Sequence, residues 1–303
     1  MKASIDIGTN SVLLLVCEVT HGVIRVLHEK QAVPRLGKGV DKERNLHSDS
    51  CERVLHILRD YQNFLETIDT DLSRKAIVTA TSAVRDANNR DTFMNLVHKA
   101  TGWNIRLLSG QEEAQTTYNG ALSVLNNRRE TGNMIIDIGG GSTEISFGEG
   151  FRLLQGKSID MGSVRFTERF FRNDPPTGPE IKRARAEIKR YLTGVEKPHD
   201  NFDVIGVAGT VTSLAAIHQK MGDYEANLLN GSELGRDQLK KSIIEFSKMS
   251  YRELEEKYPP FLTGRGEVIL AGALILDEIL EWCGKKRVIV STGGIRHGIL
   301  LGE

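Results

Sequence analysis

The chain has 303 residues, of which 39% are apolar and 26% charged, and its 40 basic and 40 acidic residues give a net charge of zero. A balanced charge argues against a nucleic-acid-binding protein, which normally carries a broad basic surface. No apolar run approaches the roughly 20 residues of a membrane span, and Met1-Lys2 leads into a predicted strand rather than an apolar signal region. We therefore expect a cytoplasmic protein of two domains, with no nucleic-acid or membrane partner.

The first half of the chain reads as a β-meander followed by alternating helices and strands. A tight turn at His21-Gly22 joins two of the meander strands. A capping-box pattern at Asp49 and Glu52, followed by apolar residues at helical spacing, predicts the first long helix. The predicted strands are 3–6, 12–19, 23–31, 75–80 and 105–108, and the predicted helices are 49–68, 91–100 and 111–125.

A polar, turn-rich stretch at residues 126–133 separates the two halves and predicts the domain boundary. We expect one domain over residues 1–125 and a second over 126–292. The second half opens with another set of three strands and then becomes mainly helical. Its predicted strands are 134–137, 143–147, 151–159, 204–207 and 288–290, and its predicted helices are 163–171, 180–192, 211–221, 238–249 and 267–283.

One motif occurs twice, as IDIGTNS at residues 5–11 and as IDIGGGSTE at residues 136–144. Each copy ends a short apolar strand on an aspartate and then supplies small residues whose N–H groups can approach an anion closely. Both copies continue into a second strand, whereas a P-loop or a Rossmann fingerprint would continue into a helix. Two such hairpins in related halves predict a cleft that holds a phosphorylated ligand and a metal.

Two further loops of small residues follow strands, at 207–212 and 291–294. The first precedes a predicted helix, where N–H groups and the helix dipole favour an anion. A glycine after a strand is more often simple turn chemistry, so neither loop is specific alone. Four such loops in one chain favour phosphate binding.

These motifs resemble those of the exopolyphosphatase/guanosine pentaphosphatase (Ppx/GppA) phosphatase family, within the superfamily of acetate and sugar kinases, Hsp70 and actin. The matching segments occur in the family's order along nearly the whole chain, at 6–11, 35–37, 80–87, 109–114, 137–144, 209–210 and 295–298. The length is similar to that of the short, two-domain members. The resemblance implies an α/β fold of two ribonuclease H-like (actin-like ATPase) domains with an interdomain active-site cleft, and a first domain that residues 293–303 complete.

The resemblance also suggests roles for two charged residues. Glu113 is similar to the family's catalytic glutamate and is our candidate for the base that orients the attacking water, in preference to its neighbour Glu112. Arg85 is expected to bind a terminal phosphate through its two-pronged guanidinium, as a further catalytic residue. The alternative for Arg85 is a surface pair with Asp86.

Carboxylates and small residues are expected to hold the metal and the phosphate oxygens. Asp137 and Glu144, which we also count as catalytic, form with Asp6 a hard, oxygen-rich site suited to Mg²⁺, with Mn²⁺ as an alternative. The small residues of these loops have two explanations, namely donation of N–H groups or hydroxyls to phosphate oxygens and the geometry of the turns themselves. The expected substrate-binding residues are Asn10, Ser11, Gly140, Gly141, Ser142, Gly209, Thr210 and Arg296.

The resulting hypothesis is an exopolyphosphatase that removes the terminal phosphate of inorganic polyphosphate by metal-assisted, in-line attack of water. Guanosine pentaphosphate (pppGpp) is the alternative substrate. An ATP-dependent phosphotransferase and a polyphosphate sensor without turnover are the less favoured hypotheses. The sequence leaves open whether the protein forms a homodimer. The cation-rich segment 182–190 is interpreted as solvated helix surface rather than a polyphosphate track.

Overall fold

The computed structural model describes residues 1–125, 132–197 and 202–302, which form two compact units. Unit 1 comprises Met1–Ser123 together with Gly293–Glu303, and unit 2 comprises Val124–Thr292. Most of the predicted boundary stretch, residues 126–131, lies outside the described residues. Within the described ranges, the helices are all too short or too polar to cross a membrane.

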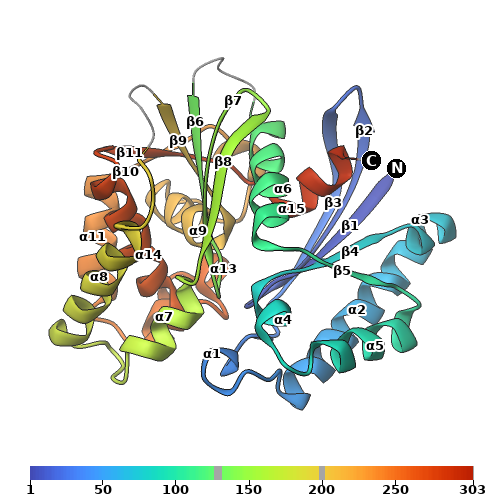
Figure 1. Cartoon of the computed structure of the whole chain (residues 1–303), viewed down its shortest axis with the longest axis horizontal. Coiled ribbons are helices and arrows are strands. Elements are labelled where there is room, and N and C mark those ends of the chain that lie inside the picture. The colour runs from blue at the N-terminus through green and yellow to red at the C-terminus, as the bar shows by residue number, and fades with distance from the viewer. Residues whose placement is uncertain (126–131, 198–201, 303) are drawn as a thin grey trace. The chain divides into compact units, whose positions relative to one another are not determined.

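Unit 1 is built on a five-stranded sheet of order β3–β2–β1–β4–β5 (Figure 1). The first three strands form the predicted antiparallel meander, while β4 and β5 run parallel to β1. The strands are β1 (Lys2–Ile7), β2 (Val12–Thr20), β3 (Val23–Ala32), β4 (Ile77–Ala80) and β5 (Ile105–Leu107).

Helices cover both faces of this sheet because its central strands are apolar on both sides. Leu14 packs in the core formed with α2 and α5, whereas the next residue, Leu15, packs with Ile299 and Leu300 of α15. The predicted capping box at the start of α2 is wrong, since the helix begins one residue earlier and its N-cap, His47, makes no side-chain cap bond. The helices of unit 1 are α1 (Val40–Glu43), α2 (Ser48–Ile68), α3 (Thr70–Arg74), α4 (Ser82–Asp86), α5 (Arg90–Thr101), α6 (Gly110–Ser123) and α15 (Ile295–Leu301).

The C-terminal helix α15 lies directly against α6, as Figure 1 shows in red and green. Glycines make this approach close. A Cβ on Gly120 would lie 2.0 Å from the carbonyl oxygen of Gly294, and a Cβ on Gly298 would lie 1.8 Å from that of Thr116. The backbones of the two helices therefore touch, and this contact joins residues 293–302 to unit 1.

Unit 2 repeats the topology of unit 1. Its sheet has the order β10–β11–β9–β6–β7–β8, in which β8–β7–β6–β9–β11 matches β3–β2–β1–β4–β5 in both order and strand direction. The additional edge strand β10 was not predicted from the sequence. The strands are β6 (Gly132–Ile138), β7 (Thr143–Glu149), β8 (Arg152–Ile159), β9 (Phe202–Val207), β10 (Glu233–Gly235) and β11 (Arg287–Val290).

The long helix α14 is the centre of the unit 2 core and is buried along most of its length. Helix α8 packs on it and is tied to it by ion pairs, among them Arg185 with Asp277 at 2.8 Å and Lys189 with Glu278 at 3.5 Å. These pairs give Arg185 and Lys189 a structural role, whereas Lys182, Arg183 and Arg190 are exposed, as expected of solvated helix surface. The helices are α7 (Ser163–Phe170), α8 (Gly178–Leu192), α9 (Ala208–His218), α10 (Ala226–Leu229), α11 (Arg236–Phe246), α12 (Tyr251–Lys257), α13 (Pro259–Leu262) and α14 (Gly266–Trp282).

Candidate active site

The two repeated motifs fold into the same hairpin in their respective units. In unit 1 the N–H of Gly8 donates to the carbonyl of Ser11 at 2.9 Å, and in unit 2 Gly139 donates to Ser142 at 3.0 Å. Each turn connects two antiparallel strands. The expectation of a strand–turn–strand motif, rather than a strand–helix phosphate loop, is confirmed in both units.

The unit 2 turn is held from behind by the first residues of α7. The carbonyl of Gly139 accepts from the N–H of Ser163 at 2.9 Å, and the carbonyl of Gly140 accepts from the N–H groups of Val164 and Arg165 at 2.9 and 3.1 Å. The Gly141 carbonyl accepts from Nε of Arg165 at 2.6 Å. In a trans peptide the C=O and the following N–H point in opposite directions. The N–H groups of residues 140–142 therefore point away from α7, as successive donors suited to an anion.

The unit 1 turn is held in a similar way by the segment that follows β3. The N–H of Gly37 donates to the carbonyl of Thr9 at 2.7 Å, and the N–H of Arg35 donates to that of Asn10 at 3.0 Å. Arg35 adopts φ 56°, an uncommon conformation for a residue with a side chain. The peptide geometry again turns the N–H groups of Asn10 and Ser11 away from the supporting segment.

Two buried carboxylates face each other across the β6–β7 hairpin. Asp137 is paired directly opposite Glu144, so both side chains lie on one face of the sheet, and only 8% and 2% of the two residues is exposed. Ser158 donates to Oε1 of Glu144 at 2.6 Å. In unit 1 the residue opposite Asp6 is Leu13, so the first copy of the motif supplies one carboxylate where the second supplies two.

The carboxylate pair fits a hard divalent cation. In the part of the chain that the structure describes, no group of three His, Cys, Asp or Glu side chains is arranged to hold a metal. Mg²⁺ does not require such a group, because it usually keeps several waters and binds one or two carboxylates together with substrate phosphates. Asp137 and Glu144 offer that donor set.

Arg85 and Glu113 form an ion pair within unit 1. Arg85 lies on the short helix α4, and its NH1 donates to Oε2 of Glu113 at 2.9 Å and to the carbonyl of Leu108 at 3.0 Å. The side chains are 23% and 6% exposed. The alternative expected from the sequence is a surface pair with Asp86. The structure shows Glu113 as a partner of the Arg85 guanidinium.

The neighbouring Glu112 has a different role. Its carboxylate accepts from both the N–H and the hydroxyl of Ser109, at 2.9 and 2.8 Å, and the Ser109 hydroxyl accepts from the N–H of Glu112. These bonds, with a smaller contribution from Arg106, hold the pKa of Glu112 below its ordinary value. The Ser-x-x-Glu spacing at 109–112 is a capping-box signal that the sequence analysis missed.

Gly209 and Thr210 lie in the first turn of α9, not in a loop as expected. Helix α9 begins at Ala208, whose φ is 65°, directly after β9. A Cβ on Gly209 would lie 1.9 Å from NH1 of Arg265, and a Cβ on Gly272 of α14 would lie 2.4 Å from the Thr210 hydroxyl. Glycine at 209 thus admits the Arg265 guanidinium to the start of α9. No motif had identified Arg265.

Arg296 anchors α15 to the unit 1 sheet. Its NH1 lies 3.1 Å from Oε1 of Glu29 and donates to the carbonyl of Leu14 at 3.2 Å. Its own carbonyl accepts from the hydroxyl of Ser4 at 2.8 Å. These contacts supply a structural reason for Arg296 beside the expected role in substrate binding.

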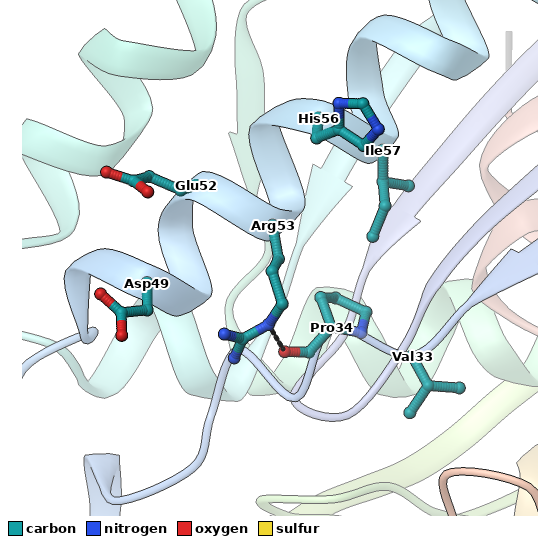
Figure 2. Close-up of a pocket in the computed structure, with 7 residues that line it drawn as sticks. All are labelled: Val33, Pro34, Asp49, Glu52, Arg53, His56 and Ile57. Atoms are coloured by element: carbon teal, nitrogen blue, oxygen red, sulfur yellow. Dashed lines mark hydrogen bonds between the residues drawn. The ribbon is translucent and has the colours of Figure 1, made fainter.

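Two surface cavities are lined by residues other than those predicted for the site. The first, of about 540 Å³, lies in unit 1 between α2 and the segment after β3, where Nε of Arg53 donates to the carbonyl of Pro34 at 3.0 Å (Figure 2). The second, of about 560 Å³, lies in unit 2. The first is lined by Val33, Pro34, Asp49, Glu52, Arg53, His56 and Ile57, and the second by Lys189, Leu192, Thr193, Val195, Lys197, Glu278, Glu281 and Trp282.

Comparison with known proteins gives consistent matches along the chain. A model of the Ppx/GppA phosphatase family matches residues 15–303. Exopolyphosphatase 2 of Mycobacterium tuberculosis is 32% identical, over 99% of this chain and 97% of the relative. A bifunctional 3-dehydroquinate synthase/phosphatase of Fusobacterium nucleatum is 33% identical, and there the match covers 99% of this chain but only 46% of the relative.

Solved structures extend the comparison to the fold. The crystal structure of the Aquifex aeolicus member of the Ppx/GppA family matches with a TM-score of 0.82 and 31% identity, over 99% of this chain and 96% of the other. The similarity covers both units. The predicted fold of two ribonuclease H-like (actin-like ATPase) domains is therefore confirmed.

Proposed function

Since this chain belongs to the Ppx/GppA phosphatase family and is a phosphatase, we propose that it hydrolyses the terminal phosphoanhydride of inorganic polyphosphate and releases orthophosphate. The observation that carries the proposal is the Arg85–Glu113 pair, a nearly buried carboxylate in the first turn of α6 whose orientation is set by a guanidinium at 2.9 Å. The similarity to Exopolyphosphatase 2 supports polyphosphate as the substrate.

In the proposed reaction Glu113 orients a water and accepts its proton. The water oxygen forms a bond to the terminal phosphorus as the bond from that phosphorus to the bridging oxygen breaks, and the shortened chain leaves with the bridging oxygen. Arg85 holds the carboxylate of Glu113 in one orientation, which places the water before it reacts. Contact of Arg85 with the terminal phosphate, as expected from the sequence, remains part of the proposal.

The hairpin turns are proposed to bind the phosphate oxygens of the substrate. The N–H groups of Gly140, Gly141 and Ser142 point away from the carbonyls that α7 holds, so they need no rearrangement to meet an anion. Asn10 and Ser11 supply the equivalent donors of unit 1. Gly209 and Thr210 are kept as proposed phosphate ligands because the first N–H groups of α9 are not used within the helix.

Asp137 and Glu144 are proposed to hold Mg²⁺ or Mn²⁺, and Asp6 is kept as a proposed metal ligand. The bound cation would neutralise the charge of the phosphate oxygens. The two carboxylates of unit 2 lie on the same sheet face and are nearly buried, so they are held in place before the cation binds.

Phosphate release from short polyphosphate, long polyphosphate and pppGpp, each with Mg²⁺ and with chelator, tests the proposal. The chain offers a matched pair of variants in Glu113→Gln and Glu112→Gln. We expect Glu113→Gln to lower kcat by about 10²- to 10⁴-fold, the usual contribution of a general base, and Glu112→Gln to leave kcat within about twofold.

Each other outcome would change the assignment. Release from pppGpp alone would make pppGpp the substrate of the same site. Release from none of the three would favour ATP-dependent transfer or sensing without turnover. Equal losses in both variants would show that Glu113 is not the base.

A further inference from the structure

The supports of the two hairpin turns differ in the donor to one carbonyl. In unit 1 the supporting donors to Thr9 and Asn10 are the backbone N–H groups of Gly37 and Arg35. In unit 2 the backbone N–H groups of α7 reach the carbonyls of Gly139 and Gly140, and the third carbonyl, that of Gly141, accepts from the side chain of Arg165. One side chain in unit 2 thus does what backbone does in unit 1.

Arg165 is unusually placed for an arginine. It lies in the first turn of α7 with 5% of its surface exposed, its Nε is 2.6 Å from the Gly141 oxygen, and its NH2 is 3.8 Å from Oδ1 of Asp160. Burying a guanidinium is costly unless its N–H groups are bonded. The short bond from Nε to a main-chain carbonyl satisfies one of the buried N–H groups and ties the side chain to the turn.

The Gly141 carbonyl belongs to the same peptide as the N–H of Ser142. Rotation of this peptide changes ψ of Gly141 and φ of Ser142, and Gly141 resists the rotation little on its side because it has no Cβ. A rotated peptide would present its carbonyl oxygen to a phosphate in place of the N–H, and a carbonyl repels an anion. The orientation of this one peptide therefore decides whether Ser142 is a donor to substrate.

Resting on the proposed function, we propose that Arg165 is a positioning residue, which locks the Gly141–Ser142 peptide with its N–H turned toward the substrate phosphate. Arg165 acts through the carbonyl of Gly141 and does not itself touch the substrate. Its side chain is thereby a determinant of polyphosphate affinity, although it belongs to the helix behind the turn.

Gly162, the N-cap of α7, shows separately that α7 packs directly behind the turn. Its φ of −125° suits any residue, so no backbone strain calls for glycine. A Cβ there would lie 2.3 Å from the oxygen of Gly140 and 2.5 Å from the carbonyl carbon of Gly141. The glycine is needed because the turn and the start of α7 are in backbone contact.

The test compares Arg165→Met and Arg165→Lys with Arg169→Met as the matched control. Arg169 lies one turn later on α7, is exposed, and donates to the Tyr191 hydroxyl at 3.2 Å. Tripolyphosphate binding by calorimetry gives Kd, steady-state hydrolysis gives KM and kcat, and hydrogen exchange of residues 139–143 in phosphate-free protein reports on the peptide directly.

We expect Arg165→Met to raise Kd and KM together by about ten- to a hundredfold, the effect of losing one charge-assisted hydrogen bond. Hydrogen exchange of residues 139–143 should quicken in the same variant. Arg165→Lys should recover part of the affinity because an ammonium can still donate to the carbonyl, and Arg169→Met should match the wild type.

Wild-type affinity and exchange in Arg165→Met would overturn the proposal. If that variant fails to fold, NMR of the wild-type protein supplies the test. The amide resonance of Ser142 must change its chemical shift when the protein is saturated with tripolyphosphate, and an unchanged shift refutes the inference. If the wild type binds no tripolyphosphate, the proposed function fails and with it the claim on affinity. In that case, unchanged hydrogen exchange of residues 139–143 in Arg165→Lys would also refute the proposal that Arg165 locks the peptide. Faster exchange in that variant would support it.

Discussion

Replacing Gly298 by alanine should destabilise unit 1, although alanine is the better helix former. The added Cβ would lie 1.8 Å from the Thr116 oxygen, and contacts under 3.0 Å essentially never occur, so α15 and α6 must separate by about 1.2 Å (3.0 − 1.8). The obstacle is backbone, which cannot rotate aside. Separation also loosens the contacts of Ile299 and Leu300 with the sheet.

The two effects of the substitution oppose each other. Alanine in a helix is favoured over glycine by about 1 kcal/mol, whereas overpacking against fixed atoms costs typically 1–3 kcal/mol and occasionally more. Because both helices and the sheet contact must adjust, we take the upper part of that range and expect a net loss of about 2 kcal/mol in the free energy of unfolding.

Urea unfolding of Gly298→Ala beside Gly178→Ala measures this difference. A Cβ on Gly178, in the first turn of α8, would meet nothing within 4 Å, so this control should be as stable as the wild type or slightly more so. A Gly298→Ala protein as stable as the control would refute the backbone contact between α6 and α15.

Three further predictions concern single side chains. Burial and the charge of Arg296 lower the pKa of His297 from 6.5 to about 3. As the pH falls, the unfolded chain therefore binds this proton before the folded protein does. The free energy of unfolding is at its full value above about pH 7 and should decline below pH 6.5 by up to about 1.4 kcal/mol per pH unit. His297→Leu should remove that part of the slope in urea titrations between pH 7 and pH 4. Asp137→Asn should raise the Mg²⁺ concentration for half-maximal phosphate release at least about tenfold, since one of the three proposed carboxylate ligands is lost; an unchanged value would remove Asp137 from the proposed metal site. Burial raises the pKa of the Cys17 thiol to about 11, so iodoacetamide at pH 8 should label this residue only after unfolding, as peptide mass spectrometry can show.

Local patterns predicted most of the fold. The two hairpins could be predicted because strand alternation and small turn residues are properties of neighbouring positions. In both turns the N–H of the first glycine donates to the carbonyl of the serine three residues later. Helix α4 and strand β10 were missed for the converse reason. Helix α4 has five residues and β10 three, too few to show a period, and both depend on what packs against them.

The family motifs identified which residues to consider, and the structure distinguished between neighbours. Glu112 and Glu113 have the same chemistry, but only the packing of α6 assigns one to a capping box with Ser109 and the other to an ion pair with Arg85. Arg296, expected at the substrate, also has a structural partner in Glu29. Arg165 had no motif to mark it, because its partner is a main-chain carbonyl 24 residues away in sequence.

The sequence by itself determined the duplicated hairpins, the α/β class and the family, because these depend on spacing within short segments. Only the tertiary structure decided which charged groups meet, how the carbonyls of each turn are held, and that α15 packs on α6 through Gly120 and Gly298. Those features join residues far apart in the chain. They depend on how closely packed backbones approach each other, to a precision of a few tenths of an ångström. Residue types and their spacing along the chain do not predict that approach.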